Sequence, residues 1–428
     1  MATTKQKSGA AYDVLIVGGG MVGAALACAL GNSSLKVAVL DRAPPAAPDK
    51  DYDVQGRTNA ASAGSAGAAD QRVSAITLAS QTFFENVGAW TGMTRQRVSP
   101  VREMQVWSEG GSGAIHFNAA EIGEPCLAWI IENRVIQAAL IERLHQFTNV
   151  HYLCPVEVAD ITLADNGAVI TLKDGRLLQT RLLVGADGAD SEVRRATGIE
   201  SQSLNLNQKG IVATVTTEKP HEATARQRFL TTGPLAFLPL DEPHTCSIVW
   251  SADNARADQL LAFDDAAFIS ELQAKFGEAL GKIKTVSPRA GFSLALSHAK
   301  AYTAPHLALV GDAAHTVHPL AGQGVNLGFL DAATLAEVLL EAAANQKDIG
   351  AHAVVRRYER WRKGDNLAMV SITGGFRYLF GNDLPGVSQL RNWGLELTNA
   401  ATPVKNFIMR RASGLEGDLP KLARRALH

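Results

Sequence analysis

The pattern of hydrophobic and polar positions begins with a strand, a turn, a helix and a second strand. YDVLIVGGG, at residues 12–20, is a β-branched run that ends in glycines, and MVGAALACALGN, at 21–32, reads as a helix that closes at Gly31-Asn32. LKVAVLD, at 35–41, is a second apolar strand. This order predicts a βαβ unit at the start of the chain.

Further along, the pattern predicts a long loop, two helical stretches and several strands. Residues 43–69 are rich in Ala, Gly, Ser and Pro, which predicts a surface loop that buries little, with no function assigned to it. Residues 72–94 and 127–148 are expected to be helical, and strands are expected within 150–163, 168–173 and 180–188.

From about residue 201 to 300 the pattern changes to alternating strands, such as KGIVATVTTE and HTCSIVWSA, with a helix near 265–280. Alternation of this kind favours an antiparallel sheet, and we expect it to form a separate lobe that faces the substrate. Beyond Val310 the chain is expected to be mainly helical.

Composition narrows the classes of function. The 428 residues are 46% hydrophobic and 19% charged, with a net charge of −1, as in an ordinary globular protein of two or three lobes. The lack of a basic field makes nucleic acid a poor partner. Four scattered cysteines without a CxxC pair argue against a zinc module and against a disulfide framework. With no signal-peptide pattern and no apolar run of membrane-span length, we expect a cytoplasmic protein.

The first motif is a glycine fingerprint between the first strand and the first helix. Gly18, Gly20 and Gly23 have GxGxxG spacing. The first glycine allows a tight turn, the second lets a pyrophosphate approach the backbone, and the third lets helix and strand pack closely. Asp41 ends the second strand about 20 residues on, where a carboxylate accepts ribose hydroxyls. The motif predicts dinucleotide binding and does not separate NAD from FAD.

The second motif is LLVGADGADSEVRRATG, at residues 182–198. An apolar strand ends at Asp187-Gly188, and Ser191 and Arg194 follow at helical spacing. One interpretation is a plain strand-turn-helix connection with Ser191 near the helix start. In the other, Asp187 contacts a ligand or holds the loop that does. The residues leave both open.

The third motif is GDAAHTVHPLAGQGVN, at residues 311–326. His315 and His318 are three apart, as zinc ligands can be, but no third ligand has a convincing spacing and HExxH is absent. The alternative is an acid, Asp312, after a strand, then a bend of small residues, then a helix start near Asn326. A helix N-terminus favours negative charge in the bend, which suits the anionic pyrimidine edge of a reduced flavin.

Three motifs in this order resemble the FAD-dependent aromatic-ring hydroxylases, of the fold of p-hydroxybenzoate hydroxylase. The longer HPLAGQGVNLGFLD is similar to the signature of the ubiquinone-biosynthesis branch, as are DQRVSAI, IIENRVIQAAL, GPLAFLPL and LRNWGLELTNAATPVKNFIMRRASGL. The resemblance covers almost the whole chain, with the 43–69 loop as its departure. It implies that FAD is the cofactor.

The resemblance also implies roles for single residues. The glycines of the fingerprint hold the FAD pyrophosphate, Asp41 holds the adenosine ribose, Arg42 lies beside the adenine, and the backbone of Val156 touches it. Further cofactor contacts are implied for Arg72, for either Asn133 or Arg134, for Asp187, for Gly311 and Asp312, and for the backbone of Gly322, Gln323, Gly324, Val325 and Asn326. For Arg72 and Arg134, an ordinary salt bridge is the alternative.

The chemistry implied by the resemblance is hydroxylation of a phenol ring through a flavin C4a-hydroperoxide, with NAD(P)H or another reductant and O2. The flavin does the chemistry, so no catalytic side chain is assigned. The substrate is expected to be a polyprenylated phenol. Phe237, Pro239, His318 and Pro319 are candidates for its binding face, with Phe237 as ordinary core the alternative.

Two further partners are expected: a membrane surface, because the prenyl tail of the substrate is hydrophobic, and other proteins of ubiquinone biosynthesis. The C-terminal tract mixes apolar residues with Lys405, Arg410, Arg411, Arg424 and Arg425, which suits a peripheral contact with the inner membrane. Packing of terminal helices with exposed arginines is the alternative. Other ubiquinone-biosynthesis proteins are the second expected partner.

Three rival functions share part of these sequence features. A nicotinamide or flavin dehydrogenase would share the fingerprint but would not need the third motif. A hydroxylase of a soluble aromatic compound shares the three motifs without the HPLAGQGVNLGFLD extension. A non-catalytic scaffold of the quinone-biosynthesis assembly is the rival from another class.

Pattern and resemblance together predict an α/β protein. It has a Rossmann-like FAD-binding domain, a second and mainly antiparallel β substrate domain, and a helical C-terminus. The FAD-binding domain is expected at 10–80, 125–200 and 295–345, the substrate domain at 81–124 and 201–294, and the C-terminal helical region at 346–428.

Overall fold

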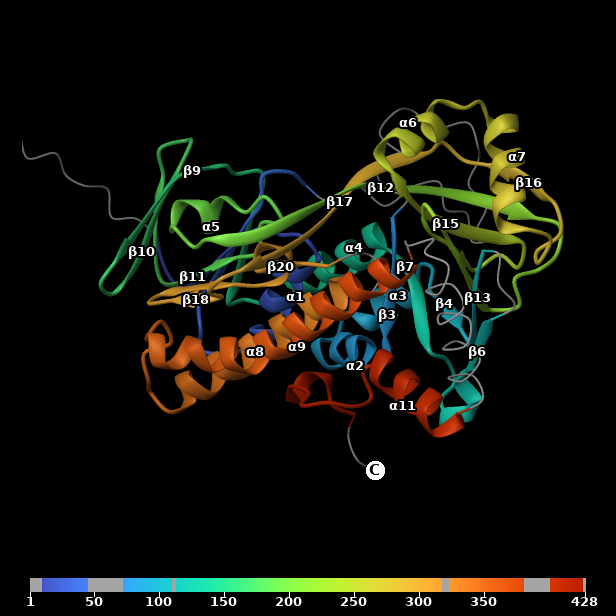
Figure 1. Ribbon diagram of the computed structural model, residues 1–428. Helices are drawn as coiled ribbons and strands as arrows, with labels where there is room; N and C mark the ends of the chain where they lie inside the picture. The colour runs from blue at the N-terminus through green and yellow to red at the C-terminus, as the bar shows by residue number, and fades with distance from the viewer. Residues whose placement is uncertain (1–9, 45–71, 110–112, 318–323, 381–400, 426–428) are drawn as a thin grey trace, which may run out of the picture.

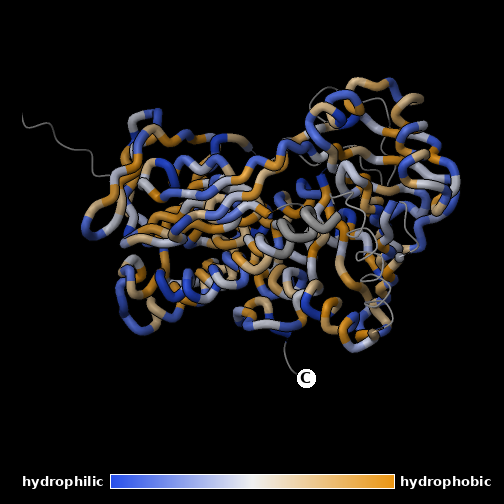
Figure 2. The backbone as a smooth tube through the Cα atoms, viewed as in Figure 1, coloured by the Kyte–Doolittle hydropathy of each residue, from blue (hydrophilic) through white to orange (hydrophobic). Residues whose placement is uncertain are grey.

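The computed structural model describes residues 10–44, 72–109, 113–317, 324–380 and 401–425. The chain forms two lobes, each built around its own sheet, and the long strands β12 (Ser201–Thr217) and β17 (Ala290–Ala299) run from one lobe to the other (Figure 1). Hydrophobic residues are concentrated in the strands and helices inside both lobes (Figure 2). Most of the predicted 43–69 loop lies outside the described residues.

The first sheet carries the predicted βαβ unit. Its strands are β1 (Ala10–Val17), β2 (Val37–Leu40), β8 (Val150–Leu153), β9 (Val158–Ala164), β10 (Gly167–Leu172), β11 (Leu177–Gly185), β18 (Thr303–Ala304) and β19 (Leu307–Leu309). β19, β11, β1, β2 and β8 lie side by side in parallel, and β9 and β10 extend β11 as an antiparallel hairpin. The apolar strand segments VLI, at residues 14–16, and LLV, at residues 182–184, are fully buried because helices or loops cover both faces of a parallel sheet.

The second sheet is the expected antiparallel one. It contains β12, β17, β5 (Glu103–Ser108), β6 (Ala114–Asn118), β13 (Thr224–Leu230), β14 (Gly233–Pro239), β15 (Thr245–Asp253), β16 (Ile283–Val286) and β20 (His315–Thr316). Every pairing is antiparallel except that of β13 with β5. α6 (Asn254–Ala262) and α7 (Asp265–Phe276) cover one face, where Phe237, Trp250 and Phe268 form a second core.

The helices expected at 72–94 and 127–148 are wrong in part, because the first residues of each stretch form strands of a small third sheet. β3 (Val73–Thr77) and β4 (Ser99–Val101) both pair antiparallel with β7 (Ala128–Glu132). Helix begins only afterwards, in α2 (Leu78–Val87) and α3 (Trp90–Thr94) on one side and α4 (Asn133–Leu144) on the other. The first residues of the two stretches pair with each other across the fold, and such a long-range pairing overrides helical periodicity.

The remaining helices place the third motif. They are α1 (Met21–Ala29), α5 (Glu192–Ala196), α8 (Gly324–Ala344), α9 (His352–Phe380) and α11 (Thr402–Ala412), with short 3₁₀ turns η2 (Ala119–Ile122), η3 (Gly311–Ala313) and η5 (Lys421–Ala423). α8 packs on α1, α2 and α9. No helix in the described part of the chain is long and apolar enough to cross a bilayer.

The predicted fold class is confirmed: a Rossmann-like α/β domain, a mainly antiparallel second domain and helices at the C-terminal end. The domain limits remain a proposal, and one of them needs a shift. Phe83, Phe84 and Met93 are packed in the core of the first lobe, so residues 81–94 group with the FAD-binding domain rather than the substrate domain.

Candidate functional site

Two glycines of the fingerprint are required by packing within the protein. A Cβ on Gly18 would lie 2.3 Å from the carbonyl oxygen of Ala186, and Gly18 itself has a φ of +106°. A Cβ on Gly23 would lie 1.9 Å from the carbonyl oxygen of Gly18. These contacts are shorter than any tolerated approach, so the first and third glycines let β1, α1 and the end of β11 pack closely.

The middle glycine faces open space. Gly20 is the N-cap of α1 with no side-chain cap, and a Cβ placed on it would meet no atom within 4 Å. Gly20, Met21 and Val22, at the start of this helix, line a large cavity. The first turn of a helix leaves N–H groups without an intrahelical partner, and such groups are suited to bind anions. Gly20 therefore lies where a pyrophosphate would approach the backbone, and the residues present fit the predicted role.

Asp41 is tied to the glycine loop at the end of β2. Its carboxylate accepts hydrogen bonds from the backbone N–H of Gly19 at 3.0 Å and of Ala43 at 3.2 Å. The backbone N–H of Val156 donates to the carbonyl of Asp41 at 2.8 Å, and Arg42 is exposed beside it. The three residues expected around the adenosine, Asp41, Arg42 and Val156, thus lie together at one edge of the sheet, and their contacts with the cofactor stay a prediction.

A large cavity lies between the two lobes, with a volume of about 590 Å³. One wall comes from the FAD-binding motifs: the start of α1, β3, Asn133, the turn after β11, Asp312 and the start of α8. The other wall is the inner face of the second sheet. The lining residues include Gly20, Arg72, Ser74, Asn133, Gly188, Val212, Leu238, Val249, Phe292, Leu294, Asp312, Thr316, Gly324, Val325 and Gly328. A cavity of this volume, lined by both polar and apolar residues, suits a cofactor ring together with a small ligand.

Asp312 is exposed to this cavity rather than to the outer surface. Desolvation by the surrounding protein raises the pKa of its carboxyl group above the ordinary value, and the charges of His315 and Arg72 oppose that rise only in part. An acid in this setting is stabilised when a ligand supplies hydroxyl donors, as the ribityl chain of FAD would.

Replacing Asp312 with alanine should weaken FAD binding by about ten- to a hundred-fold. A hydrogen bond to a charged group contributes roughly 1.5–3 kcal/mol, and about 1.4 kcal/mol is a factor of ten in a dissociation constant. The FAD-free variant should be at least as stable as the FAD-free parent, because a desolvated carboxylate is removed. Flavin fluorescence titration and thermal unfolding of the FAD-free proteins measure the two effects. An unchanged dissociation constant would make Asp312 a scaffold residue.

Of the alternatives Asn133 and Arg134, the structure brings Asn133 to the cavity. Asn133 begins α4, and its side-chain oxygen accepts a hydrogen bond from Ser74 Oγ at 2.7 Å. Arg134 instead forms an ion pair with Glu132, 2.5 Å between Nε and Oε2. Arg72 also lines the cavity. Its backbone carbonyl accepts a hydrogen bond from the N–H of Asn133. The cofactor contact of Asn133 remains a prediction, now preferred over that of Arg134.

The second motif holds its own loop. Asp187 accepts hydrogen bonds from Ser191 Oγ at 2.5 Å and from the N–H of Val193 at 3.0 Å, and Ser191 caps α5. Arg194 donates to the carbonyl of Ala313 at 2.7 Å and so links this loop to η3. Both oxygens of Asp187 are engaged by the protein, which favours the interpretation in which Asp187 positions the loop.

The helix start of the third motif is fixed by Asn326. Its side chain donates to the carbonyl of Ala75 at 2.7 Å and accepts from the N–H of Thr77 at 3.0 Å. Gly328 allows α8 to approach α1, since a Cβ there would lie 2.6 Å from Val22 Cγ2. Gly324 and Val325 line the cavity. His318, Pro319, Gly322 and Gln323 lie outside the described residues.

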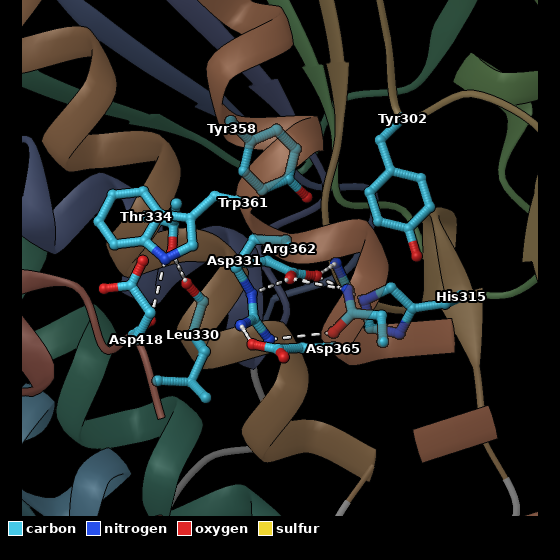
Figure 3. A network of polar contacts seen from close by, with 12 residues as sticks. Tyr302, His315, Leu330, Asp331, Thr334, Tyr358, Trp361, Arg362, Asp365 and Asp418 are labelled. Carbon is cyan, nitrogen blue, oxygen red and sulfur yellow. Dashed lines mark hydrogen bonds and ion pairs between the residues drawn. The ribbon is translucent and has the colours of Figure 1, made fainter. Parts of the chain in front are cut away.

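A buried ionic network behind Asp312 was missed by the sequence analysis. Asp331, on α8, accepts from His315 Nε2 at 2.5 Å, from Arg362 Nε at 3.1 Å and from Asn366 Nδ2 at 3.1 Å, and Figure 3 shows the first three side chains turned toward one another. Asp331 also accepts from the N–H of Gly311 at 3.2 Å. A lone acid within the apolar run LGFLDAATL was the available signal.

This network explains His315 without a metal. His315 is buried with 1% of its surface exposed, and its partner Asp331 is fully buried. Among the described residues, no group of three His, Cys, Asp or Glu side chains could hold a metal ion. The network instead ties η3 to α8 and α9 and so positions the turn that carries Asp312.

Metal analysis tests this assignment directly. The purified protein should contain no stoichiometric zinc, and a chelator should leave its activity unchanged, because the imidazole of His315 is already bonded to Asp331. Elemental analysis and an assay before and after chelation are the measurements. Activity that a chelator removes and zinc restores would contradict the prediction.

The candidate substrate residues on β14 need a correction. Phe237 is fully buried on the far face of the second sheet, where its ring stacks on Phe276 with centroids 3.7 Å apart. Pro239, two positions on, is on the same face because side chains alternate along a strand. Leu238, between them, lines the cavity. Phe237 is therefore core, and Leu238 takes its place as the candidate contact.

Comparison with known proteins places the chain in a family. Residues 11–364 match the FAD binding domain family. The chain is 37% identical to ubiquinone hydroxylase UbiL of Rhodospirillum rubrum, over 96% of this chain and 92% of that protein. It is 35% identical to mitochondrial ubiquinone biosynthesis monooxygenase COQ6 of Homo sapiens, over 94% and 92%, and to 3-demethoxyubiquinol 3-hydroxylase of Escherichia coli, over 94% and 98%.

Solved structures share the fold. p-Nitrophenol 4-monooxygenase PnpA of Pseudomonas putida superposes with a TM-score of 0.75 at 18% identity, covering 96% of this chain and 99% of that one. PqsL of Pseudomonas aeruginosa superposes with a TM-score of 0.74 at 23% identity, covering 90% and 99%. With the glycine cradle, the inter-lobe cavity and relatives matched along nearly their whole length, the chain belongs to the FAD-binding-domain family of flavoprotein monooxygenases, beside the ubiquinone-biosynthesis hydroxylases, and its cofactor is FAD.

Proposed function

We propose that this protein hydroxylates the ring of a polyprenylated phenol in ubiquinone biosynthesis. The observation that carries the proposal is the composition of the cavity: cofactor-binding motifs form one wall, and apolar side chains of the second sheet form the other. The relatives named for ubiquinone hydroxylation support the choice of substrate class. When bound, FAD supplies the activation of O2 after reduction by NAD(P)H or another reductant.

The side chains of the cavity suit a reaction carried by the cofactor. Among its described lining residues, only Arg72 and Asp312 are charged, and none is a histidine, cysteine or lysine. Both charges are on the FAD-binding wall. The protein therefore binds and orients the two reactants, and we assign no catalytic side chain.

The opposite wall excludes water from the reacting ring. Val212, Leu238, Val249, Phe292 and Leu294 come from β12, β14, β15 and β17 and present an apolar surface to the cavity. Such a surface accepts an aromatic ring by area burial. It also keeps water from the activated oxygen, which would otherwise be lost as hydrogen peroxide.

Oxygen-isotope transfer tests the proposed function. Holoprotein supplied with NADPH or NADH, ¹⁸O₂ and a geranyl-substituted phenol should form a ring-hydroxylated product that carries one ¹⁸O atom. Hydroxylation of soluble phenols alone would favour the alternative, a hydroxylase of a soluble aromatic compound. A purified protein that lacks flavin absorbance would favour the scaffold.

We also propose contact with a membrane surface, but the basic residues of the C-terminal tract give it little support, because several of them are paired within the protein. Lys405 is buried and paired with Glu121, Arg425 with Glu124, and Arg424 with Asp418. What supports the contact is the apolar surface of α11, where Val404, Phe407 and Ile408 are 51%, 55% and 40% exposed. Recruitment to an assembly of other ubiquinone-biosynthesis proteins is a second proposal for the same surface.

A further inference from the structure

A second, smaller cavity lies next to the one that holds the cofactor motifs. Its volume is about 110 Å³, and it lies between the three-stranded sheet, the second sheet and α11. The lining is almost entirely apolar, with alanines at Ala75, Ala225 and Ala236 where larger side chains would close the space. Protein interiors are packed tightly enough that a void of this size requires an explanation.

The two cavities share a wall. Leu238 lines both, with 7% of its surface exposed, and on β3 the large cavity is lined by Val73 and Ser74 while the small one is lined by Ala75 and Thr77. A ring held against Leu238 in the large cavity therefore has the small cavity beside it. A substituent on that ring meets apolar surface there rather than water.

The small cavity also reaches the outside of the molecule through α11. Ile408 and Met409 line it, and Ile408 is at the same time 40% exposed. Of the six exposed large hydrophobic residues among those described, three are on α11. In Figure 1 α11 lies at the edge of the molecule, beside α2 and below β6. A chain longer than the cavity can leave over this apolar helix.

We propose that the small cavity binds the first part of the isoprenoid tail, with Leu238 between the ring and the tail and with α11 carrying the remainder to the surface. The inference rests on the proposed function, since it assumes a prenylated phenol as substrate. The volume suits about one isoprene unit of five carbons, judged by the engineered cavity of about 150 Å³ that binds benzene.

A fatty acid is the alternative occupant, because one charged residue, Arg226, also lines the cavity. Arg226 lines the cavity and is 8% exposed, and its Nη1 donates to the carbonyls of His221 and Thr224 at 3.0 and 3.3 Å. Its Nε has no hydrogen-bond partner among the described residues. A carboxylate could pair with it, but the position of this cavity directly beside the ring-binding cavity, across Leu238, favours an uncharged tail that continues from a ring.

Filling the cavity tests the proposal by binding rather than by turnover. The FAD-loaded protein is titrated calorimetrically with a phenol and with the same phenol carrying a geranyl tail. The parent should bind the geranyl compound at least tenfold more tightly. Ala236→Leu should reduce that ratio toward one while leaving the dissociation constant of the plain phenol and the FAD content unchanged.

Matched variants keep the result interpretable. Ala266→Leu adds the same volume at an exposed position on α7 and should keep the parental ratio. If Ala236→Leu does not fold, Ala225→Val, which adds less volume to the same cavity, takes its place. Photolabelling of the parent with a diazirine-bearing geranyl phenol should mark peptides from β14 or α11.

Three outcomes would overturn the proposal. An unchanged ratio in the cavity variants, or labelling elsewhere, would place the tail at another surface. Tighter binding of palmitate than of the geranyl phenol, lost in Arg226→Met, would assign the cavity to a fatty acid. If the parent binds both compounds equally and still hydroxylates the plain phenol, the tail site is wrong and the proposed function stands. If binding depends on the tail but no hydroxylation occurs, the proposed function is wrong and the tail site stands.

Discussion

A Gly20→Val variant should fold normally and purify without its yellow cofactor. A side chain at this position clashes with no part of the protein, since no protein atom lies within 4 Å of the new Cβ. When FAD binds, the space around this Cβ is where the pyrophosphate would approach the start of α1, and a branched side chain blocks it. Visible absorbance per protein measures FAD content, and circular dichroism measures folding.

Gly23→Val is the matched control. The same change three residues later places a Cβ 1.9 Å from the carbonyl oxygen of Gly18, so the variant should fail to fold or should lose much of its stability. A Gly20→Val protein with a normal flavin content would show that the pyrophosphate does not approach at Gly20.

An Asp331→Ala variant should lose about 3–5 kcal/mol of unfolding free energy, because removing one partner of a buried ion pair leaves the other charge uncompensated. Asp331 is completely buried, and the change strands Arg362, of which 1% is exposed, and leaves His315 and Asn366 without their acceptor. Chemical denaturation of the FAD-free protein measures the loss. FAD affinity should fall as well, since the N–H of Gly311 beside Asp312 is bonded to the same carboxylate.

An Asp365→Ala variant tests whether the burial of Asp331 is the reason for the large expected loss of stability. Asp365 pairs with the same arginine, 3.2 Å from Nη1, but its side chain is 44% exposed. Solvent-exposed pairs contribute about 0–1 kcal/mol, so this variant should be nearly as stable as the parent. Equal losses in the two variants would contradict the assignment of a central role to Asp331.

The pH dependence has a definite sign. Desolvation acts to raise the pKa of Asp331, but the charge of His315 and its hydrogen bond, together with Arg362 and Asn366, outweigh it and hold the pKa below the ordinary value. The ionised form is therefore favoured by folding, and its contribution is complete above the unfolded pKa of about 3.9. The stability difference between the parent and Asp331→Asn should stay constant above that pH and shrink as the pH falls through the lower, folded pKa.

Local signals in the sequence were enough to predict the elements on which the expected cofactor-binding residues lie. The fingerprint glycines, Asp41 and the small residues of the third motif act through the backbone or over short distances, so their order along the chain already predicts a strand, a turn and a helix start. The resemblance of the three motifs then distinguished FAD from NAD. The fold class followed because strand alternation and apolar runs are also local properties.

Other features depended on contacts between distant segments. The stretches that begin at Val73 and at Ala128 look helical in isolation, and only their pairing with each other makes them strands. Which face of β14 meets the cavity depends on the register of β14 in its sheet, which places Leu238 inward and Phe237 in the core. A shift of one residue would exchange the two.

The sequence by itself determined the nucleotide-binding unit, the order of the motifs and the class of cofactor, because each is encoded within a few adjacent residues. Only the tertiary structure decided that Asp331 and Arg362, 31 residues apart, meet behind Asp312. It alone placed α11 against β3 and β14 to enclose a second cavity. Burial and cavity shape arise where distant segments pack, and a local pattern carries no information about which segments those are.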